Sequence, residues 1–283
     1  TKALCDVPKM SSGGKPVEGG YFIFTDEEKS DFLLKEPKAI TLIKRYVGSD
    51  DFINGYNRWC LWLKGCTPKE LRNLPECMKR VELVREYRLN SKKAATRACA
   101  ETPTLFMEIK QPEGNFLIVP EVSSERRRYV PIGYANTEMI CSNKVRYVPN
   151  ATLYHFGILT SNIHMAWLRT VCGRLKSDYS YSVNIVYNNF PWPEPTAQQR
   201  QKIEQTAQAI LDARALYPDS SLADLYDELT MPPELRKAHH QNDMAVMQAY
   251  GFTKGSEAYK SEAACVAELM KLYQKKVEEI EKR

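Results

Sequence analysis

Residues 151–193 of the chain read ATLYHFGILTSNIHMAWLRTVCGRLKSDYSYSVNIVYNNFPWP. Within this stretch, residues 160–172 are apolar nearly all round at helical spacing, with Ile163 and Trp167 on the same side. A helix of this kind is normally buried in a protein core. Gly173 is expected to end the helix, because glycine commonly follows a helix C-terminus.

The spacing of apolar side chains then changes from helical to alternating. Apolar and polar residues alternate from Asp178 to Tyr187, which predicts a strand with one apolar face. Pro191 and Pro193 are expected to end this strand, since proline cannot donate to a sheet ladder. The charged turn at residues 174–178 is thus held between two rigid elements, where it can present side chains to a partner.

Composition and charge bound the class of protein. The chain has 283 residues, 43% hydrophobic and 27% charged, as in a globular protein with one large or two medium domains. Its net charge of +5 is compatible with a nucleic-acid partner without establishing one. No apolar run reaches 18 residues, so we expect no membrane partner. The chain begins at Thr1 without a signal peptide, and we expect it to be a fragment preceded by another domain.

The eight cysteines do not follow the spacing of a metal site. None forms a CxxC pair or has a histidine at zinc-ligand spacing. Several lie in apolar patterns, where free cysteine behaves as a small buried residue. We therefore expect reduced core thiols, no bound metal and a cytoplasmic location.

The order of patterns predicts an α+β fold. Helices and short strands are mixed over residues 1–194, which we take as one domain, and the segment 195–283 is helical throughout. Capping boxes predict helix starts at Thr25, Thr67 and Thr196.

Further elements follow from local patterns. Residues 37–47 are expected to form a helix that Pro37 opens. A long helix is expected from Pro75 to about Ala98, and short strands follow between residues 104 and 148.

Basic residues gather in two places outside the 151–193 stretch. One group lies on the predicted helix that starts at Pro75, and the other is the run Arg126–Arg128 between two predicted strands. Both can be solvated faces, and both can contact phosphate or a guanine edge. The candidates for such contacts are Arg85, Arg88, Lys92, Lys93, Arg126, Arg127 and Arg128, together with Arg174 from within the 151–193 stretch.

No catalytic motif occurs in the chain. HExxH, GxSxG, a Walker sequence and a GxGxxG after a strand are all missing, and residues 188–193 lack the order of the [DNS]PP[YFW] loop of amino-methylating DNA enzymes. His155 and His164 lie in apolar patterns and are expected to be core residues, while His239 lies in a polar helical pattern. We therefore name no catalytic residue.

Several segments together resemble a known family. The stretches HFGILTSNIHMAWLRTVCGRL and DYSYSVNIVYNNFPWP, with TDEEKSDFLLKEP, DFINGYNRWCLWL and SSERRRYVPIGY before them, resemble the C-terminal part of MmeI-like DNA methyltransferases. These are large single-chain type II restriction–modification proteins that methylate adenine N6 with S-adenosylmethionine. The resemblance covers nearly the whole chain and implies a target recognition domain followed by a helical segment. It also implies double-stranded DNA and an upstream methylase domain as partners, with S-adenosylmethionine bound upstream and no cofactor in this fragment.

The resemblance further implies a base-reading pair just after the GRL motif, at Lys176 and Asp178. Residues two apart in an extended segment point the same way, a lysine can donate to guanine, and an aspartate can accept from cytosine N4. An exposed ion pair of little energetic value is the other interpretation. Ser180 and Asn184 share the predicted polar face and are weaker base-reading candidates.

Two other functions stay open from the sequence. One is a self-contained enzyme with an unrecognised site around His155, His164 and Arg174. The other is an interaction module whose helical tail docks a partner protein. A bound ligand or a deep pocket would favour the enzyme, and salt-insensitive failure to bind DNA would favour the interaction module.

Overall fold

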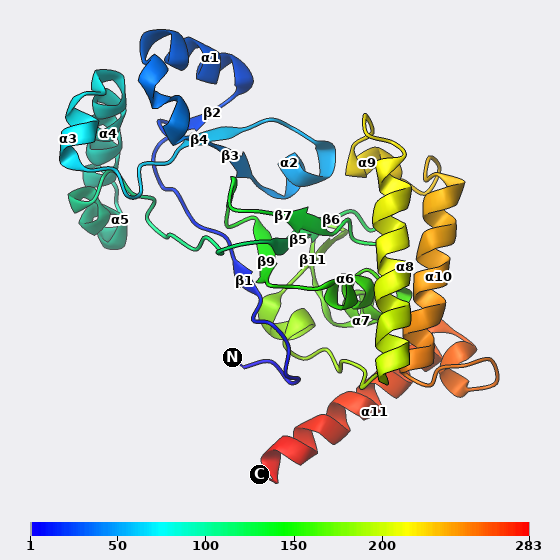
Figure 1. Cartoon of the computed structure of the whole chain (residues 1–283). Helices are drawn as coiled ribbons and strands as arrows, with labels where there is room; N and C mark the ends of the chain where they lie inside the picture. The colour runs from blue at the N-terminus through cyan, green and yellow to red at the C-terminus, as the bar shows by residue number, and fades with distance from the viewer. Residues whose placement is uncertain (1, 283) are drawn as a thin grey trace. The chain divides into compact units, whose positions relative to one another are not determined.

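The structure is a computed structural model that describes residues 2–282. Packing divides the chain into two compact units, each made of separate segments (Figure 1). Unit 1 comprises Thr1–Ser11, Gly114–Tyr134 and Arg146–Arg283, and unit 2 comprises Ser12–Glu113 and Ala135–Val145. The domain boundary predicted at residue 194 lies within unit 1, where both sides of it contribute to one core, and it stays a prediction.

Unit 2 combines a small sheet with short helices. Its elements are β2 (Ile23–Phe24), α1 (Asp26–Lys35), the 3-10 helix η1 (Pro37–Leu42), β3 (Ile43–Val47), α2 (Ser49–Asn54), β4 (Trp59–Leu61), α3 (Pro68–Arg72), α4 (Pro75–Leu89), α5 (Ala94–Ala98), the 3-10 helix η2 (Cys99–Glu101) and β8 (Met139–Cys141). The sheet order is β2-β4-β3-β8, with β3 antiparallel to β4 and parallel to β8. Phe22, Phe24 and Val84 belong to its buried core.

The other strands form two sheets and lie in unit 1, except for the end residues Ser12, Ala135 and Val145, which belong to unit 2. These strands are β1 (Ser11–Ser12), β5 (Phe116–Pro120), β6 (Val122–Ser123), β7 (Gly133–Ala135), β9 (Val145–Pro149), β10 (Gly173–Leu175) and β11 (Asp178–Ser180). One sheet has the order β1-β9-β5-β7, and the other has the order β10-β11-β6. The second sheet is fully antiparallel.

The helices of unit 1 follow the strands in the chain. They are α6 (Leu153–Leu159), α7 (Asn162–Val171), the π-helix η3 (Val183–Tyr187), α8 (Ala197–Ala215), α9 (Leu222–Leu225), α10 (Pro233–Ala249), the 3-10 helix η4 (Glu257–Tyr259) and α11 (Glu262–Glu281). In Figure 1, α8 and α10 lie side by side, yellow and orange. The whole fold is α+β with a helical C-terminal region, as predicted.

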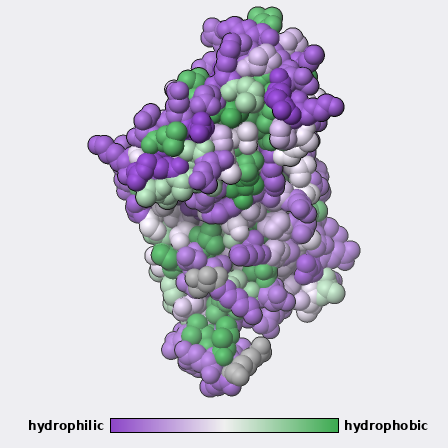
Figure 2. Space-filling model, turned by 90° about the vertical axis from the view of Figure 1, so that its left-hand side faces the viewer, coloured by the Kyte–Doolittle hydropathy of each residue, from purple (hydrophilic) through white to green (hydrophobic). Residues whose placement is uncertain are grey.

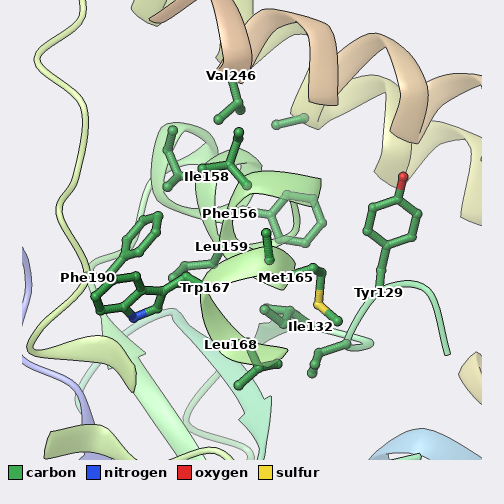
Figure 3. Close-up of a cluster of buried hydrophobic side chains, with 14 of the residues drawn as sticks. Tyr129, Ile132, Phe156, Ile158, Leu159, Met165, Trp167, Leu168, Phe190 and Val246 are labelled. Atoms are coloured by element: carbon green, nitrogen blue, oxygen red, sulfur yellow. The ribbon is translucent and has the colours of Figure 1, made fainter. Parts of the chain in front are cut away.

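The core of unit 1 forms around α6 and α7. Phe156, Ile158 and Leu159 of α6 lie beside Met165 and Trp167 of α7, all of them buried (Figure 3). The predicted buried helix is therefore confirmed.

Helix α6 packs closely against α8 because it carries a glycine at the contact. A Cβ at Gly157 would lie 2.7 Å from the Ile203 side chain, which is closer than packed atoms approach.

The capping boxes at Thr25, Thr67 and Thr196 are confirmed, and each begins a helix. A capping box satisfies two backbone donors locally, so it acts independently of tertiary packing.

Three predicted elements are wrong in their extent. The expected helix over residues 37–47 is a short 3-10 helix followed by strand β3, and the expected helix from Pro75 to Ala98 is broken between α4 and α5. The expected strand from Asp178 to Tyr187 stops at Ser180, and the chain then turns into η3. The Ser182 side chain accepts from the Ile185 backbone N–H at 3.3 Å, a cap that the alternating pattern concealed.

The surface and the thiols complete the fold. None of the helices within residues 2–282 combines the length and apolar character needed to cross a membrane. Figure 2 shows hydrophilic residues over most of one face, with smaller hydrophobic patches between them. All eight cysteines are free thiols, and Cys60, Cys77, Cys141 and Cys265 are buried as expected.

Candidate nucleic-acid interface

The strands β10 and β11 form a hairpin with a two-residue turn. Leu175 pairs with Asp178, which leaves Lys176 and Ser177 as the turn. The backbone of Lys176 has a φ of 57°, in the left-handed region that residues other than glycine rarely adopt. The Lys176 side chain is exposed. The hairpin therefore presents a lysine at its tip on a backbone that carries strain, a feature that is concentrated at functional sites.

Arg174 stabilises the hairpin from its outer face. Its guanidinium lies 4.4 Å from the centroid of the Tyr179 ring, and it donates to the Ser177 carbonyl at 2.9 Å. Tyr179 is buried, whereas Arg174 is exposed. Part of the donor capacity of Arg174 is therefore used within the hairpin.

The hairpin also holds the segment Arg126–Arg128, which we call the arginine segment. Strand β11 pairs with β6, directly before this segment. The Glu125 backbone N–H donates to the Asp178 carboxylate and the Tyr179 hydroxyl donates to the Glu125 carbonyl, both at 3.4 Å. The Arg174 guanidinium lies 3.8 Å from the Glu125 carboxylate. The hairpin turn and the arginine segment therefore belong to one continuous surface of unit 1.

A hollow of about 440 Å³ opens beside the arginine segment. It is lined by Glu125, Arg126, Arg127, Arg128, Tyr129, Asn162, Arg169, Glu228 and Glu262. Arg169 of α7 donates to the Arg128 carbonyl at 3.1 Å and pairs with Glu262 at 2.9 Å. Four arginines and three glutamates thus line the hollow. Its lining attracts an anionic ligand only at the places where the arginine side chains project.

Behind the arginine segment, Tyr129 is hydrogen-bonded to a buried carboxylate. Its hydroxyl donates to Asp243 at 2.6 Å, and the Asn162 backbone N–H donates to the other Asp243 oxygen at 2.8 Å. Burial raises the pKa of Asp243 to about 6, although both hydrogen bonds oppose that shift. Both oxygens of the carboxylate thus accept a hydrogen bond, and such bonds favour its ionised form.

One of the basic residues of unit 2 that were predicted to contact phosphate cannot do so. Arg88 is fully buried, and its guanidinium donates to backbone carbonyls of the residues Pro16, Val17, Cys99, Thr102 and Leu105. The prediction that Arg88 contacts DNA is therefore wrong, because its donors are used inside the core.

The other unit 2 candidates are exposed. Arg85 makes a 3.4 Å ion pair with Glu82, and the side chains of Lys92 and Lys93 lie on the surface between α4 and α5. Their role in DNA contact stays a prediction.

The predicted shared face of the base-reading candidates is also wrong in part. Lys176 lies in the turn and not in an extended strand, so its spacing from Asp178 does not set their relative direction. Ser180 is two residues from Asp178 within β11 and does share its face. Asn184 lies in η3, where its side-chain oxygen accepts from Asn188 at 3.4 Å.

The residues suggested for a self-contained enzyme do not form one site. His155 begins α6 by accepting from the Thr152 N–H at 3.0 Å, and burial lowers its pKa to about 4. His164 is buried and lies 2.8 Å from the Tyr181 hydroxyl, while Arg174 is exposed on β10. His155 lines a pocket of about 420 Å³ beside Trp192.

His239 lies in a helix, but not on its surface. It is buried, its ring stacks on Tyr129 at 4.1 Å, and its Nε2 lies 2.7 Å from the Tyr226 hydroxyl. The polar pattern around it gave no sign of this, because its partners Tyr129 and Tyr226 lie outside that pattern.

Sequence reasoning missed four residues that position the candidate surface. They are Glu125, Arg169, Tyr179 and Asp243. Glu125 lies beside the arginine run in the sequence and could have been examined with it. Asp243 offered no signal, since its partners are more than 80 residues away in the chain.

Comparisons with known proteins agree over nearly the whole chain. Residues 1–194 match the family model "MmeI, target recognition domain", and residues 195–281 match "MmeI, C-terminal domain". DNA methyltransferase A of Bacillus subtilis (strain 168) is 37% identical over 278 residues, which are 98% of this chain and 31% of that protein. A solved structure of the Type IIL restriction-modification enzyme MmeI in complex with DNA has a TM-score of 0.94 and 44% identity, over 98% of this chain and 37% of that one. The chain thus spans about a third of the length of these two relatives.

Proposed function

The chain belongs to the MmeI family, with its target recognition domain followed by its C-terminal domain, and we propose that it binds double-stranded DNA and selects the sequence that a methyltransferase modifies. The observation that carries this proposal is the joining of the Lys176 turn and the arginine segment through Glu125. A surface of this kind offers phosphate contacts and base contacts together, and specific DNA recognition needs both.

In this proposal the two parts of the surface have different roles. Arg126, Arg127 and Arg128 contact phosphates and supply affinity that depends on salt. Lys176 at the hairpin tip donates to a guanine edge, and Asp178 accepts from a cytosine amino group. The bond from the Glu125 N–H orients the Asp178 carboxylate, which has acceptor capacity left for a base.

The remaining candidates have weaker support. Ser180 shares the face of Asp178 and can contact either type of base edge. Arg174 and Asn184 already have partners within unit 1, so we assign them secondary roles. Arg85, Lys92 and Lys93 are exposed basic side chains of unit 2 and are proposed as further phosphate contacts.

For the intact protein we propose an adenine-N6 methyltransferase of a restriction–modification system. The names of the two relatives support the DNA methyltransferase activity and the restriction–modification system, and the choice of adenine N6 follows from the resemblance given above. The lack of a catalytic motif in the 283 residues agrees with a methylase domain elsewhere in the intact protein. S-adenosylmethionine would then bind in a methylase domain before residue 1, and the protein would act in the cytoplasm. The isolated chain would bind DNA without modifying it.

Salt-dependent binding tests the DNA-binding role. The intact protein is titrated with duplex DNA over a series of salt concentrations, alongside Arg126→Ala, Arg128→Ala and the control Lys271→Ala. Lys271 is an exposed residue of α11 that pairs with Glu268 at 2.7 Å. Each arginine variant should lower the slope of log K against log salt by about 0.9, and the control should leave it unchanged. Binding that does not respond to salt would refute the proposal.

The base-reading role needs a substitution that keeps the turn. Lys176→Asn does so, because asparagine tolerates a left-handed backbone. We expect this variant to lose discrimination at one base pair of the target by about 1–3 kcal/mol. Sequencing of the sites that the intact protein methylates measures the change, and an unaltered target sequence would remove Lys176 from the base-reading set.

A further inference from the structure

A buried carboxylate of the family's C-terminal domain is hydrogen-bonded to the residue that follows the arginine segment. We propose that Asp243 of α10 is a positioning residue that fixes the arginine segment in its DNA-binding conformation, an inference that rests on the proposed function. Asp243 is 3% exposed and does not itself meet solvent or ligand. It would act through Tyr129, which directly follows the arginine segment.

The contacts of Asp243 join three distant parts of the chain. One oxygen accepts from the Tyr129 hydroxyl at 2.6 Å, and the other accepts from the Asn162 N–H at the start of α7 at 2.8 Å. Burial raises the pKa of Tyr129, so its phenol stays a neutral donor. Figure 3 shows Tyr129 apart from the other labelled side chains, with its hydroxyl pointing toward the helices. The tyrosine is thereby held at the hydroxyl end of its side chain.

A second set of contacts from the same helices supports the segment after Tyr129. His239, one turn before Asp243 on α10, stacks on the Tyr129 ring at 4.1 Å. Arg214 of α8 donates to the Ile132 carbonyl at 2.6 Å and to the Tyr226 hydroxyl at 2.8 Å. The helices therefore hold both ends of residues 129–132.

The arginine segment is also tethered from its own backbone. Arg169 donates to the Arg128 carbonyl and pairs with Glu262 at the start of α11. Together with the bonds from the hairpin to Glu125, the segment is fixed at residues 125, 128 and 129. A segment that is ordered before binding loses less conformational entropy on contact with DNA, which strengthens binding without adding a contact.

The test uses two variants of the buried pair and a neighbouring control. Tyr129→Phe removes only the hydroxyl, and Asp243→Asn removes the acceptor of one of the two bonds, because an amide nitrogen cannot accept. The control is Asn242→Ala, because Asn242 is equally buried but binds the Gly157 carbonyl at 2.8 Å and the Thr206 hydroxyl at 3.0 Å. The control loses stability without touching the arginine segment.

We expect both pair variants of the intact protein to bind duplex DNA about three- to tenfold more weakly and with a smaller salt slope. Asn242→Ala should keep the slope of the unmodified protein. In an Arg126→Ala, Arg128→Ala background, Tyr129→Phe should cause a smaller further loss, because two of the three arginines through which it acts are gone. Amide hydrogen exchange of residues 124–132, measured without DNA, should be faster in Tyr129→Phe than in the control.

The outcomes separate this inference from the proposed function. If the unmodified protein lacks salt-dependent DNA binding, the proposed function fails and the inference fails with it. If the unmodified protein binds but Tyr129→Phe and Asp243→Asn keep its affinity and slope, the inference alone is wrong. An equal loss in the Arg126→Ala, Arg128→Ala background, or unchanged exchange of residues 124–132, would also overturn it.

Discussion

The guanidinium of Arg174 lies 4.4 Å from the centre of the Tyr179 ring, and the two residues are directly paired across the β10–β11 hairpin. Tyr179 in turn donates its hydroxyl to the Glu125 carbonyl. One exposed arginine is thus connected, through one buried ring, to the segment that precedes Arg126. A positive charge over an aromatic face contributes about 0.5–1 kcal/mol at exposed sites.

This pairing predicts an energetic coupling between the two side chains. A double-mutant cycle of Arg174→Ala and Tyr179→Leu, measured by urea unfolding, should give a coupling of about 0.5–1 kcal/mol. Arg174→Ala combined with Lys271→Ala should be additive, because Lys271 pairs with Glu268 and shares no partner with Arg174. Strict additivity in the first cycle would mean that the stacking contributes nothing.

Arg88 and Arg85 lie one turn apart on α4 but in opposite environments. Arg88→Ala would leave several buried carbonyls without a donor, so we expect a loss of at least about 3 kcal/mol in the free energy of unfolding. Arg85→Ala, at an exposed site, should stay within about 0.5 kcal/mol of the unmodified chain. Urea denaturation measures both, and similar losses would contradict the assignment of Arg88 to the core.

Lys176 should show opposite effects on stability and on recognition. Lys176→Gly relieves the left-handed backbone and should raise the free energy of unfolding by up to about 1 kcal/mol. The same change removes the proposed base contact and should relax the methylated sequence at one base pair. Thermal unfolding and site sequencing of the same variant check both effects. A less stable Lys176→Gly would show that the turn is not strained.

His155 should make unfolding sensitive to acid. Burial, with a smaller effect of Arg200, lowers its pKa from 6.5 to about 4. The folded state therefore keeps the ring neutral while the unfolded state protonates it, and stability that is present above pH 6.5 is lost as the pH falls toward 4.

His155→Gln preserves the cap on α6, because glutamine at the third helical position can also accept from the Thr152 N–H. We expect this variant to match the unmodified chain at pH 7.5 and to lose less stability between pH 6.5 and pH 4. Urea unfolding at several pH values gives the comparison. Parallel pH profiles would mean that His155 does not titrate differently in the two states.

Local sequence features predicted local structure well. Thr196 and Gln199 cap each other within one turn of α8, so four residues contain all the information for that helix start. The buried helix α7 was likewise visible, because nearly all its side chains are apolar and only a core can accommodate them. The spacing of apolar residues, every second residue in a strand and every third or fourth in a helix, predicted the structure less well after Ser180. There an alternating stretch folds as the helix η3.

Features that depend on distant partners were not predictable. Arg88 belongs to a basic helix pattern in the sequence. Only its hydrogen bonds to backbone carbonyls of residues 16–17 and 99–105 show that it is a core residue. His239 lies in a polar pattern and becomes a stacking partner of Tyr129 only through folding. Residues of the same type therefore have different roles, because folding places them in different surroundings.

The sequence by itself determined the α+β class, the helix caps, the buried α7 and the family to which the chain belongs, because each depends on residues close together or on motifs in order. The tertiary structure alone decided that Lys176 occupies a left-handed turn and that Asp243 holds Tyr129. The physical reason is that backbone strain and buried hydrogen bonds are set by partners brought together in folding, and a buried polar group needs such a partner wherever it lies in the chain.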